Sequence, residues 1–267
     1  MTHPGIGLRL ERIAPSGRAV VVPMDHGTSS GPIDGLESPV QAVDRASRGG
    51  ATAVVVHKGL VPAVATALGD TSLIVHLSAS TGLNPDPNDK RIVADAREAL
   101  ALGADGISVH VNVGADQESE MVEDLGRVAR SCQKLGVPLM AMLYPRGPAI
   151  DDPHSVDNVA HVARLGAELG ADLVKVPYTG TPEGFESVVE GCPVPTLISG
   201  GPKTEGVRGT LAQVEGAIRS GAAGVSIGRN VFQAEDPMLT TRALRRIVLD
   251  GDTVDEVLSE GKTKELA

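Results

Sequence analysis

A lysine interrupts one apolar run of the sequence. Lys175 lies between Ala171 and Pro177, with Gly170 before the run and Gly180 after it. Such a run is typical of a buried strand. Burial disfavours a charged ammonium group, and a neutral amine attacks carbonyl groups to form a Schiff base. The run makes Lys175 a candidate nucleophile, although a lysine at a strand end can instead reach solvent or pair with a carboxylate.

Eight apolar runs, each followed by polar or turn residues, alternate with helical patterns. The runs cover residues 19–24, 53–56, 72–75, 106–109, 139–143, 171–176, 196–198 and 224–227. Helical patterns cover residues 39–48, 89–102, 118–135, 156–169, 211–220 and 238–249. Apolar strands that alternate with helices indicate a parallel sheet covered on both faces. The expected fold is α/β, a single (β/α)8 TIM barrel in one domain over residues 1–267. An open doubly wound sheet is the alternative, and the first run lacks the Gly-x-Gly-x-x-Gly turn typical of it.

Polar residues follow most of these runs. In a (β/α)8 barrel the carboxyl ends of all strands meet at one mouth, where the active site lies. The residues expected there are Asp25, His26, His57, Lys58, His76, His110, Asn112, Tyr144, Arg146, Lys175, Gly201, Lys203, Gly228 and Arg229. Asp25 and Tyr144 would supply an acid/base pair beside the nucleophile Lys175.

The turns after the last two runs are rich in glycine and each carries a basic residue. Such turns let backbone N–H groups approach phosphate oxygens, and barrels often bind phosphate after strands 7 and 8. We expect a phosphate site formed by Gly200, Gly201, Lys203, Gly228 and Arg229. The alternative is that the glycines only make tight turns.

Three histidines, His57, His76 and His110, end consecutive runs and could bind a divalent metal ion in a metal-dependent lyase. They lack the close spacing of common metal motifs, and Asp25 already has a plausible acid/base role. We therefore expect neither a metal nor another cofactor, and we expect the histidines to hydrogen-bond substrate oxygens or neighbouring strand ends.

The composition indicates which partners and which cellular compartment to expect. The net charge of −10 argues against binding to nucleic acid. Cys132 and Cys192 have no partner at metal or redox spacing, which is typical of reduced cytoplasmic thiols. The sequence has no apolar stretch of membrane-spanning length and no signal at its amino terminus. The expectation is a cytoplasmic protein that binds no membrane.

Five motifs in order along the chain resemble those of the archaeal-type class I aldolase family. They are Met-Asp-His-Gly at 24–27, Leu-Tyr-Pro-Arg-Gly at 143–147, Asp-Leu-Val-Lys at 172–175, Gly-Gly-Pro-Lys at 200–203 and Gly-Arg-Asn at 228–230. That family includes fructose-bisphosphate aldolases and 2-amino-3,7-dideoxy-D-threo-hept-6-ulosonate synthases. Residues 73–78 and 108–114 are similar to the heptulosonate synthase branch, and residues 76–81 and 85–88 to a related aldolase of aminohydroxybenzoate pathways.

The resemblance implies roles for residues already singled out. Lys175 would form the Schiff base, Tyr144 would exchange a proton with the reacting hydroxyl, and Asp25 would act on the carbinolamine or imine. The implied substrate- and phosphate-binding residues are His26, Gly27, Arg146, Gly200, Gly201, Lys203, Gly228 and Arg229.

The implied reaction is metal-independent. It condenses a ketose phosphate, either dihydroxyacetone phosphate or a deoxyketohexose phosphate, with L-aspartate 4-semialdehyde, by aldol addition or transaldol transfer. Such relatives are often homo-oligomers and serve aromatic amino acid or aminohydroxybenzoate biosynthesis. A fructose-bisphosphate aldolase is the alternative within the family. A non-catalytic sensor of phosphorylated ligands is a further alternative, but a sensor need not keep Lys175, Tyr144 and Asp25 together.

Overall fold

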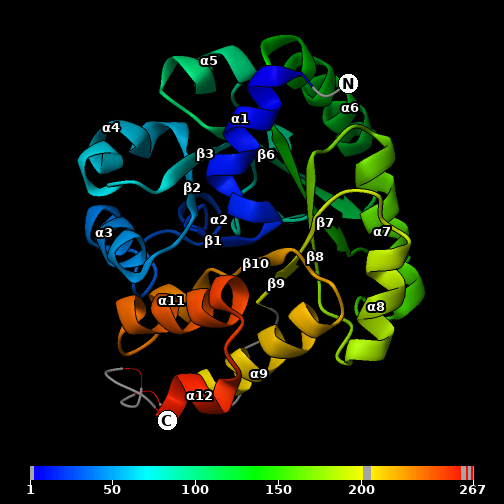
Figure 1. The fold of residues 1–267 in the computed structure, drawn as a ribbon. Helices are drawn as coiled ribbons and strands as arrows, with labels where there is room; N and C mark the ends of the chain where they lie inside the picture. The colour runs from blue at the N-terminus through cyan, green and yellow to red at the C-terminus, as the bar shows by residue number, and fades with distance from the viewer. Residues whose placement is uncertain (1–2, 201–205, 260–262, 264–265, 267) are drawn as a thin grey trace.

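The fold is built on a closed barrel of parallel strands (Figure 1). The computed structural model describes residues 3–200, 206–259, 263 and 266. Within these residues eight strands follow one another around the barrel in the order β1-β10-β9-β8-β7-β6-β3-β2. The strands are β1 (Ala19–Pro23), β2 (Ala53–His57), β3 (Ser72–His76), β6 (Gly106–Val113), β7 (Leu139–Pro145), β8 (Leu173–Val176), β9 (Thr196–Ser199) and β10 (Gly224–Ser226). Each strand lies on one of the eight apolar runs, so the predicted (β/α)8 barrel is confirmed.

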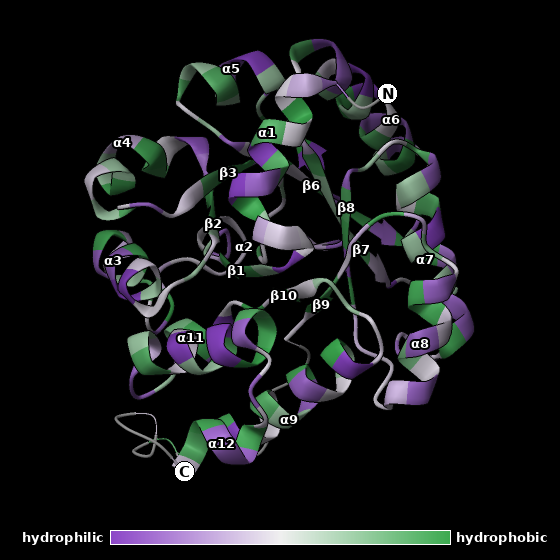
Figure 2. Cartoon of the chain, in the orientation of Figure 1, coloured by the Kyte–Doolittle hydropathy of each residue, from purple (hydrophilic) through white to green (hydrophobic). Residues whose placement is uncertain are grey.

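Helices surround the barrel in Figure 1, and Figure 2 shows that they carry both hydrophilic and hydrophobic residues. The longer helices are α3 (Pro39–Gly49), α6 (Glu118–Leu135), α7 (Val156–Glu168), α8 (Pro182–Glu190), α9 (Gly206–Arg219) and α11 (Pro237–Arg245). Shorter segments are α2 (Gly27–Ser30), α4 (Val61–Val64), α5 (Ala96–Ala101), α10 (Arg229–Phe232), α12 (Val254–Ser259), η1 (Pro15–Gly17), η2 (Lys58–Leu60), η3 (Ala65–Ala67) and η4 (Arg246–Asp250). No described helix is both long enough and apolar enough to cross a membrane.

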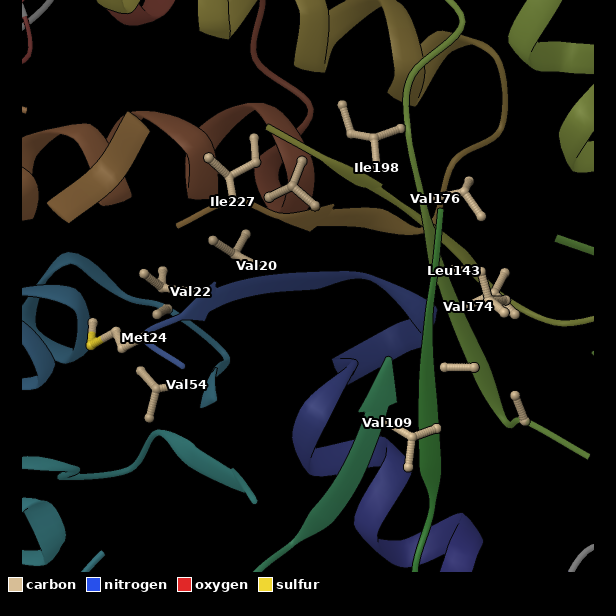
Figure 3. Packing of buried hydrophobic residues seen from close by; sticks show 14 of the residues in the cluster. Val20, Val22, Met24, Val54, Val109, Leu143, Val174, Val176, Ile198 and Ile227 are labelled. Carbon is tan, nitrogen blue, oxygen red and sulfur yellow. The ribbon is translucent and has the colours of Figure 1, made fainter. Parts of the chain in front are cut away.

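Most strands divide their buried apolar side chains between two cores. Val20, Val22 and Val54 belong to the layer between the strands and the helices (Figure 3). The alternate residues, such as Val21 and Val55, fill the inside of the barrel. Because successive side chains of a strand point to opposite faces, this alternation decides which polar residues can enter the mouth.

One helix closes the amino-terminal end of the barrel. Helix α1 (Pro4–Ile13) lies across the strands in Figure 1, and Ile13 is buried within the inner cluster. A Cβ atom at Gly106 of β6 would lie 2.7 Å from Ile13 Cδ1, so the strand packs closely on the helix here. The opposite, carboxyl-terminal end of the barrel remains free to hold a site.

The helix predicted over residues 89–102 is wrong in its first half. Residues Arg91–Ile92 form strand β5, which pairs antiparallel with β4 (Ser78–Ala79). The α-helix begins only at Ala96, because the Asp95 carboxylate accepts hydrogen bonds from the N–H groups of Arg97 and Glu98 and so caps it. The segment between β3 and α5 therefore forms an extended excursion instead of one long helix.

Candidate active site

The carboxyl ends of the strands surround a cavity of about 950 Å³. Among the residues expected at the mouth that the structure describes, those lining the cavity are Asp25, His26, His57, His76, His110, Tyr144, Arg146, Lys175, Gly200, Gly228 and Arg229. Lys58 and Asn112 do not line it. Gly27 does not line the cavity and begins helix α2 beside it. Gly201 and Lys203 lie outside the described residues. The barrel thus gathers residues that are up to about two hundred positions apart in the chain.

The register of the barrel explains why Lys175 faces inward. Leu173, two residues earlier on β8, belongs to the inner cluster, whereas Val174 and Val176 belong to the outer one. Lys175 pairs in register with Met142 of β7, which is also in the inner cluster. Only 6% of Lys175 is exposed. Lys175 is therefore largely buried on the inner side of the barrel and lines the cavity.

Tyr144 is surrounded by nitrogen-bearing side chains. Lys175 Nζ lies 5.9 Å from the centre of its ring, and Arg146 Cζ lies 5.0 Å from it. The His110 ring packs against it with centroids 4.8 Å apart. The negative face of a phenol ring attracts cations. These contacts hold the tyrosine near the amine of Lys175.

Asp25 lies between two histidines. Its Oδ2 is 3.7 Å from His76 Nε2 and its Oδ1 is 3.7 Å from His26 Nδ1. Burial raises the pKa of the Asp25 carboxyl, but positive charge on His76, His26 and Lys175 outweighs this effect and holds the pKa below its usual range. Burial lowers the pKa of His76 to about 4. At neutral pH the site thus contains a carboxylate beside neutral imidazole.

The histidines are held by hydrogen bonds to the protein. His76 Nδ1 is 2.8 Å from Ser108 Oγ, and His57 Nε2 is 3.1 Å from Thr28 Oγ1. His110 Nε2 is 2.9 Å from Asn112 Oδ1. Within the described part of the chain, no three His, Cys, Asp or Glu side chains gather in a way that could hold a metal ion. The histidine positions therefore lend no support to the metal-dependent alternative.

The Asn112 side chain determines which nitrogen of His110 carries the proton. Asn112 Nδ2 donates a hydrogen bond to the carbonyl of Asn88 at 2.8 Å, so Asn112 Oδ1 must face His110 as an acceptor. His110 Nε2 is therefore the donor. Burial lowers the pKa of His110 well below its usual value, which keeps the ring neutral.

Glycine is required sterically at one of the predicted phosphate positions. A Cβ atom at Gly228 would lie 2.7 Å from both His26 Cε1 and the Pro23 carbonyl oxygen. A Cβ at Gly200 would lie 3.0 Å from Ile227 Cγ2. At Gly228 the close packing therefore agrees with the alternative interpretation, in which the glycine makes a tight turn.

Several residues that line the cavity were not predicted, including Lys90, Ser80, Ser199 and Ser226. Ser226 is fully buried, and its hydroxyl has no hydrogen-bond partner among the described residues. Lys90 was not predicted as a site residue because the sequence pattern placed it inside a helix over residues 89–102. The turn residues Pro85 to Asn88 were the available signal that the chain bends back over the mouth here.

Comparison with known proteins identifies the family. Residues 19–234 match the family model described as DeoC/LacD family aldolase. The chain is 45% identical over 251 residues to 2-amino-3,7-dideoxy-D-threo-hept-6-ulosonate synthase 1 of Archaeoglobus fulgidus, covering 94% of this chain and 93% of that protein. It is 43% identical to 2-amino-4,5-dihydroxy-6-oxo-7-(phosphonooxy)heptanoate synthase of Streptomyces griseus, covering 86% of this chain and 85% of that protein.

A solved structure agrees with these matches. It is an archaeal fructose-1,6-bisphosphate aldolase whose catalytic lysine is covalently bound to the carbinolamine intermediate of the substrate. It superposes with a TM-score of 0.83 at 33% sequence identity, covering 90% of this chain and 98% of that one. The chain therefore belongs to the DeoC/LacD family of aldolases, and the predicted class I aldolase is confirmed.

Proposed function

We propose that this aldolase uses Lys175 as its Schiff-base residue to condense a ketose phosphate with L-aspartate 4-semialdehyde. The observation that carries the proposal is the inward-facing, buried Lys175 beside Tyr144, on the same cavity as Asp25. A buried amine, a phenol and a carboxylate are the groups that imine formation and proton transfer need.

The products named for the relatives indicate the substrates. Reversing an aldol addition between C4 and C5 of 2-amino-4,5-dihydroxy-6-oxo-7-(phosphonooxy)heptanoate gives dihydroxyacetone phosphate and L-aspartate 4-semialdehyde. The same cut through 2-amino-3,7-dideoxy-D-threo-hept-6-ulosonate gives the same aldehyde and an unphosphorylated three-carbon ketone. Transfer of that ketone from a deoxyketohexose phosphate would yield this second product. The two relatives thus share the acceptor and differ in the donor.

The proposed chemistry begins at the ketone. The Lys175 amine adds to the carbonyl carbon of the donor, and the carbinolamine loses water to give a protonated imine. The imine draws electrons from the adjacent carbon, which loses a proton and attacks the aldehyde. Asp25 would exchange protons with the carbinolamine, and Tyr144 would protonate the aldehyde oxygen as the C–C bond forms, which gives the product hydroxyl. Water then releases the product from Lys175.

The order of the strands supports a place for the phosphate of the donor. Strands β9 and β10 follow β8 around the barrel, and Gly200, Gly228 and Arg229 line the same cavity as Lys175. A phosphate on the carbon beside the ketone would reach this side. His26 and Gly27 would complete the binding surface from the end of β1. Gly201 and Lys203 keep their predicted phosphate role.

Borohydride trapping tests the proposal. Incubation with dihydroxyacetone phosphate and reduction should leave a stable adduct on Lys175, which peptide mass spectrometry would locate. Lys175→Met should abolish both the adduct and turnover. Tyr144→Phe should keep the adduct and lose condensation activity by roughly 100- to 10,000-fold, since it removes one proton-transfer group.

Three results would count against the proposal. Full turnover by Lys175→Met would remove the Schiff base from the mechanism. Failure of every ketose phosphate to form an adduct in the wild-type protein would do the same. Cleavage of fructose 1,6-bisphosphate at least as fast as the reaction with the semialdehyde would favour the fructose-bisphosphate aldolase alternative.

A further inference from the structure

Two cationic side chains on the cavity wall form no ion pair with any residue in the described part of the chain. Lys90 and Arg146 both line the cavity. Lys90 Nζ donates a hydrogen bond to Ser80 Oγ at 2.5 Å, and that hydroxyl donates to the Pro87 carbonyl at 2.8 Å. Arg146 contacts the face of Tyr144. Among the described residues neither Lys90 nor Arg146 forms an ion pair.

The two cations act on each other. Burial lowers the pKa of Lys90, Arg146 lowers it further, and the smaller effect of Asp25 raises it. Like charges held together at a partly buried site repel, and an anion placed between them removes that repulsion while forming charge-assisted hydrogen bonds. Lys90 and Arg146 thus have the chemistry of an anion-binding site.

Lys90 is held in place by the barrel. It lies in the excursion between β3 and α5, and this segment is tied to β6 at two points. Asn112 Nδ2 donates to the Asn88 carbonyl at 2.8 Å, and the His110 N–H donates to Ser78 Oγ at 2.9 Å. Ser80 adds the direct contact to the ammonium group. The lysine is thereby positioned over the mouth before any ligand arrives.

The strand order places this pair away from the proposed phosphate site. In the ring β1-β10-β9-β8-β7-β6-β3-β2, strands β9 and β10 lie across the barrel from β6 and β3. The segment that carries Lys90 follows β3 and contacts β6, while Arg146 follows β7. Lys175 and Tyr144 lie on β8 and β7, between the two sides. The cavity therefore has one cationic region at each end and the amine between them.

We infer that Lys90 and Arg146 bind the carboxylate of the aldehyde acceptor, opposite the phosphate of the donor. This inference rests on the proposed function. L-Aspartate 4-semialdehyde has its aldehyde at one end and its α-carboxylate and α-ammonium groups at the other. A molecule whose aldehyde meets the enamine at Lys175, with the donor phosphate on the side of β9 and β10, therefore places its carboxylate on the side of Lys90 and Arg146. A lysine ammonium and an arginine guanidinium both form charge-assisted hydrogen bonds to the oxygen pair of a carboxylate.

The test compares an acceptor that carries an α-carboxylate and an α-ammonium group with one that carries neither, using the same donor. In Lys90→Met, kcat/KM for L-aspartate 4-semialdehyde should fall roughly 10- to 100-fold, mainly through KM, as expected for a lost charge-assisted contact. With propanal as the acceptor, kcat/KM should stay within about twofold, because no carboxylate is bound. Arg146→Met should likewise lower kcat/KM for the semialdehyde and leave kcat/KM for propanal nearly unchanged.

Lys58→Met is the matched control. Lys58 follows the neighbouring strand β2, but its Nζ pairs with Glu98 Oε1 at 2.9 Å and it does not line the cavity. The Lys58→Met variant should keep the wild-type kcat/KM for both acceptors. Borohydride trapping of dihydroxyacetone phosphate on Lys175 should be normal in all three variants, which separates this inference from the proposed function.

Two results would overturn the inference. If Lys90→Met lowered kcat/KM equally for both acceptors, the lysine would only stabilise the structure of the cavity mouth. A selective loss with glyceraldehyde 3-phosphate, and none with the semialdehyde, would show that the two cations bind a second phosphate instead of a carboxylate. Absence of the Lys175 adduct in the wild-type protein would instead refute the proposed function.

Discussion

Asp25 and His76 differ in charge because the attraction of neighbouring charges outweighs burial for the carboxyl but not for the imidazole. A carboxylate loses hydration in the cavity, but it gains the attraction of His76, His26 and Lys175, and the pKa of Asp25 stays low. His76 also loses hydration, and the attraction of Asp25 is too weak to compensate, so its pKa falls to about 4. The Asp25 carboxylate is therefore available as a base across the neutral range.

We expect the His76 imidazole to make the fold sensitive to acid. The unfolded chain takes up a proton at His76 near its usual pKa of 6.5, whereas the folded chain does so only near 4. More protons then bind to the unfolded state, so stability falls as the pH drops through this window. A shift of this size corresponds to about 3 kcal/mol at most. Asp25, with its lowered pKa, adds a loss of stability at still lower pH.

Urea unfolding between pH 7 and 4 would measure this effect. His76→Asn should flatten the decline in the free energy of unfolding. His161→Asn, at an exposed position on α7, should leave the decline unchanged. An identical pH profile for His76→Asn and the wild type would show that this histidine does not set the acid sensitivity.

The turn between β10 and α10 illustrates how an element can require one residue type. Strand β10 must end close to β1, where the Pro23 carbonyl and the His26 ring approach Gly228. A side chain there would displace either the turn or the histidine. The backbone around Gly228 and Arg229 is thus fixed by packing against the first strand.

We predict that Gly228→Ala raises KM for dihydroxyacetone phosphate by roughly tenfold or more, since a displaced turn weakens contacts to a phosphate group. The effect should be smaller for unphosphorylated dihydroxyacetone. Gly59→Ala is the control, because a Cβ at Gly59 would meet no atom within 4 Å. Steady-state kinetics on both donors, with thermal unfolding as a check of folding, would measure this. An equal change for both donors would contradict a phosphate role for the turn.

Across the whole molecule, the packing of helix α1 and the polar residues of the cavity lie at opposite ends of the barrel axis. Helix α1 closes the amino-terminal end, where Ile13 joins the inner apolar cluster. The polar residues gather at the other end, where the strands carry Asp25, Tyr144 and Lys175. Substitutions at the closed end should therefore affect unfolding without changing the cavity.

Ile13→Ala tests this separation. Removing a fully packed side chain should lower the free energy of unfolding by about 2–5 kcal/mol. Leu8→Ala on the same helix, where Leu8 is 72% exposed, should change it by less than about 0.5 kcal/mol. Denaturant unfolding would give both values. Loss of borohydride trapping in Ile13→Ala, under conditions where it remains folded, would show that the two ends are coupled.

The sequence by itself determined the barrel and much of its mouth. The apolar runs and their spacing depend only on nearby residues, and parallel strands must present their carboxyl ends together, so Asp25, Tyr144 and Lys175 could be brought to one cavity without coordinates. The tertiary structure decided what depends on contacts between distant segments. Lys90 reaches the mouth because Asn112 and His110 of β6 hold the excursion after β3, although the local pattern favoured a helix there. Gly228 is required because the barrel closes against Pro23 and His26. Local periodicity carries no information about such contacts, since they exist only once the strands have closed into a ring.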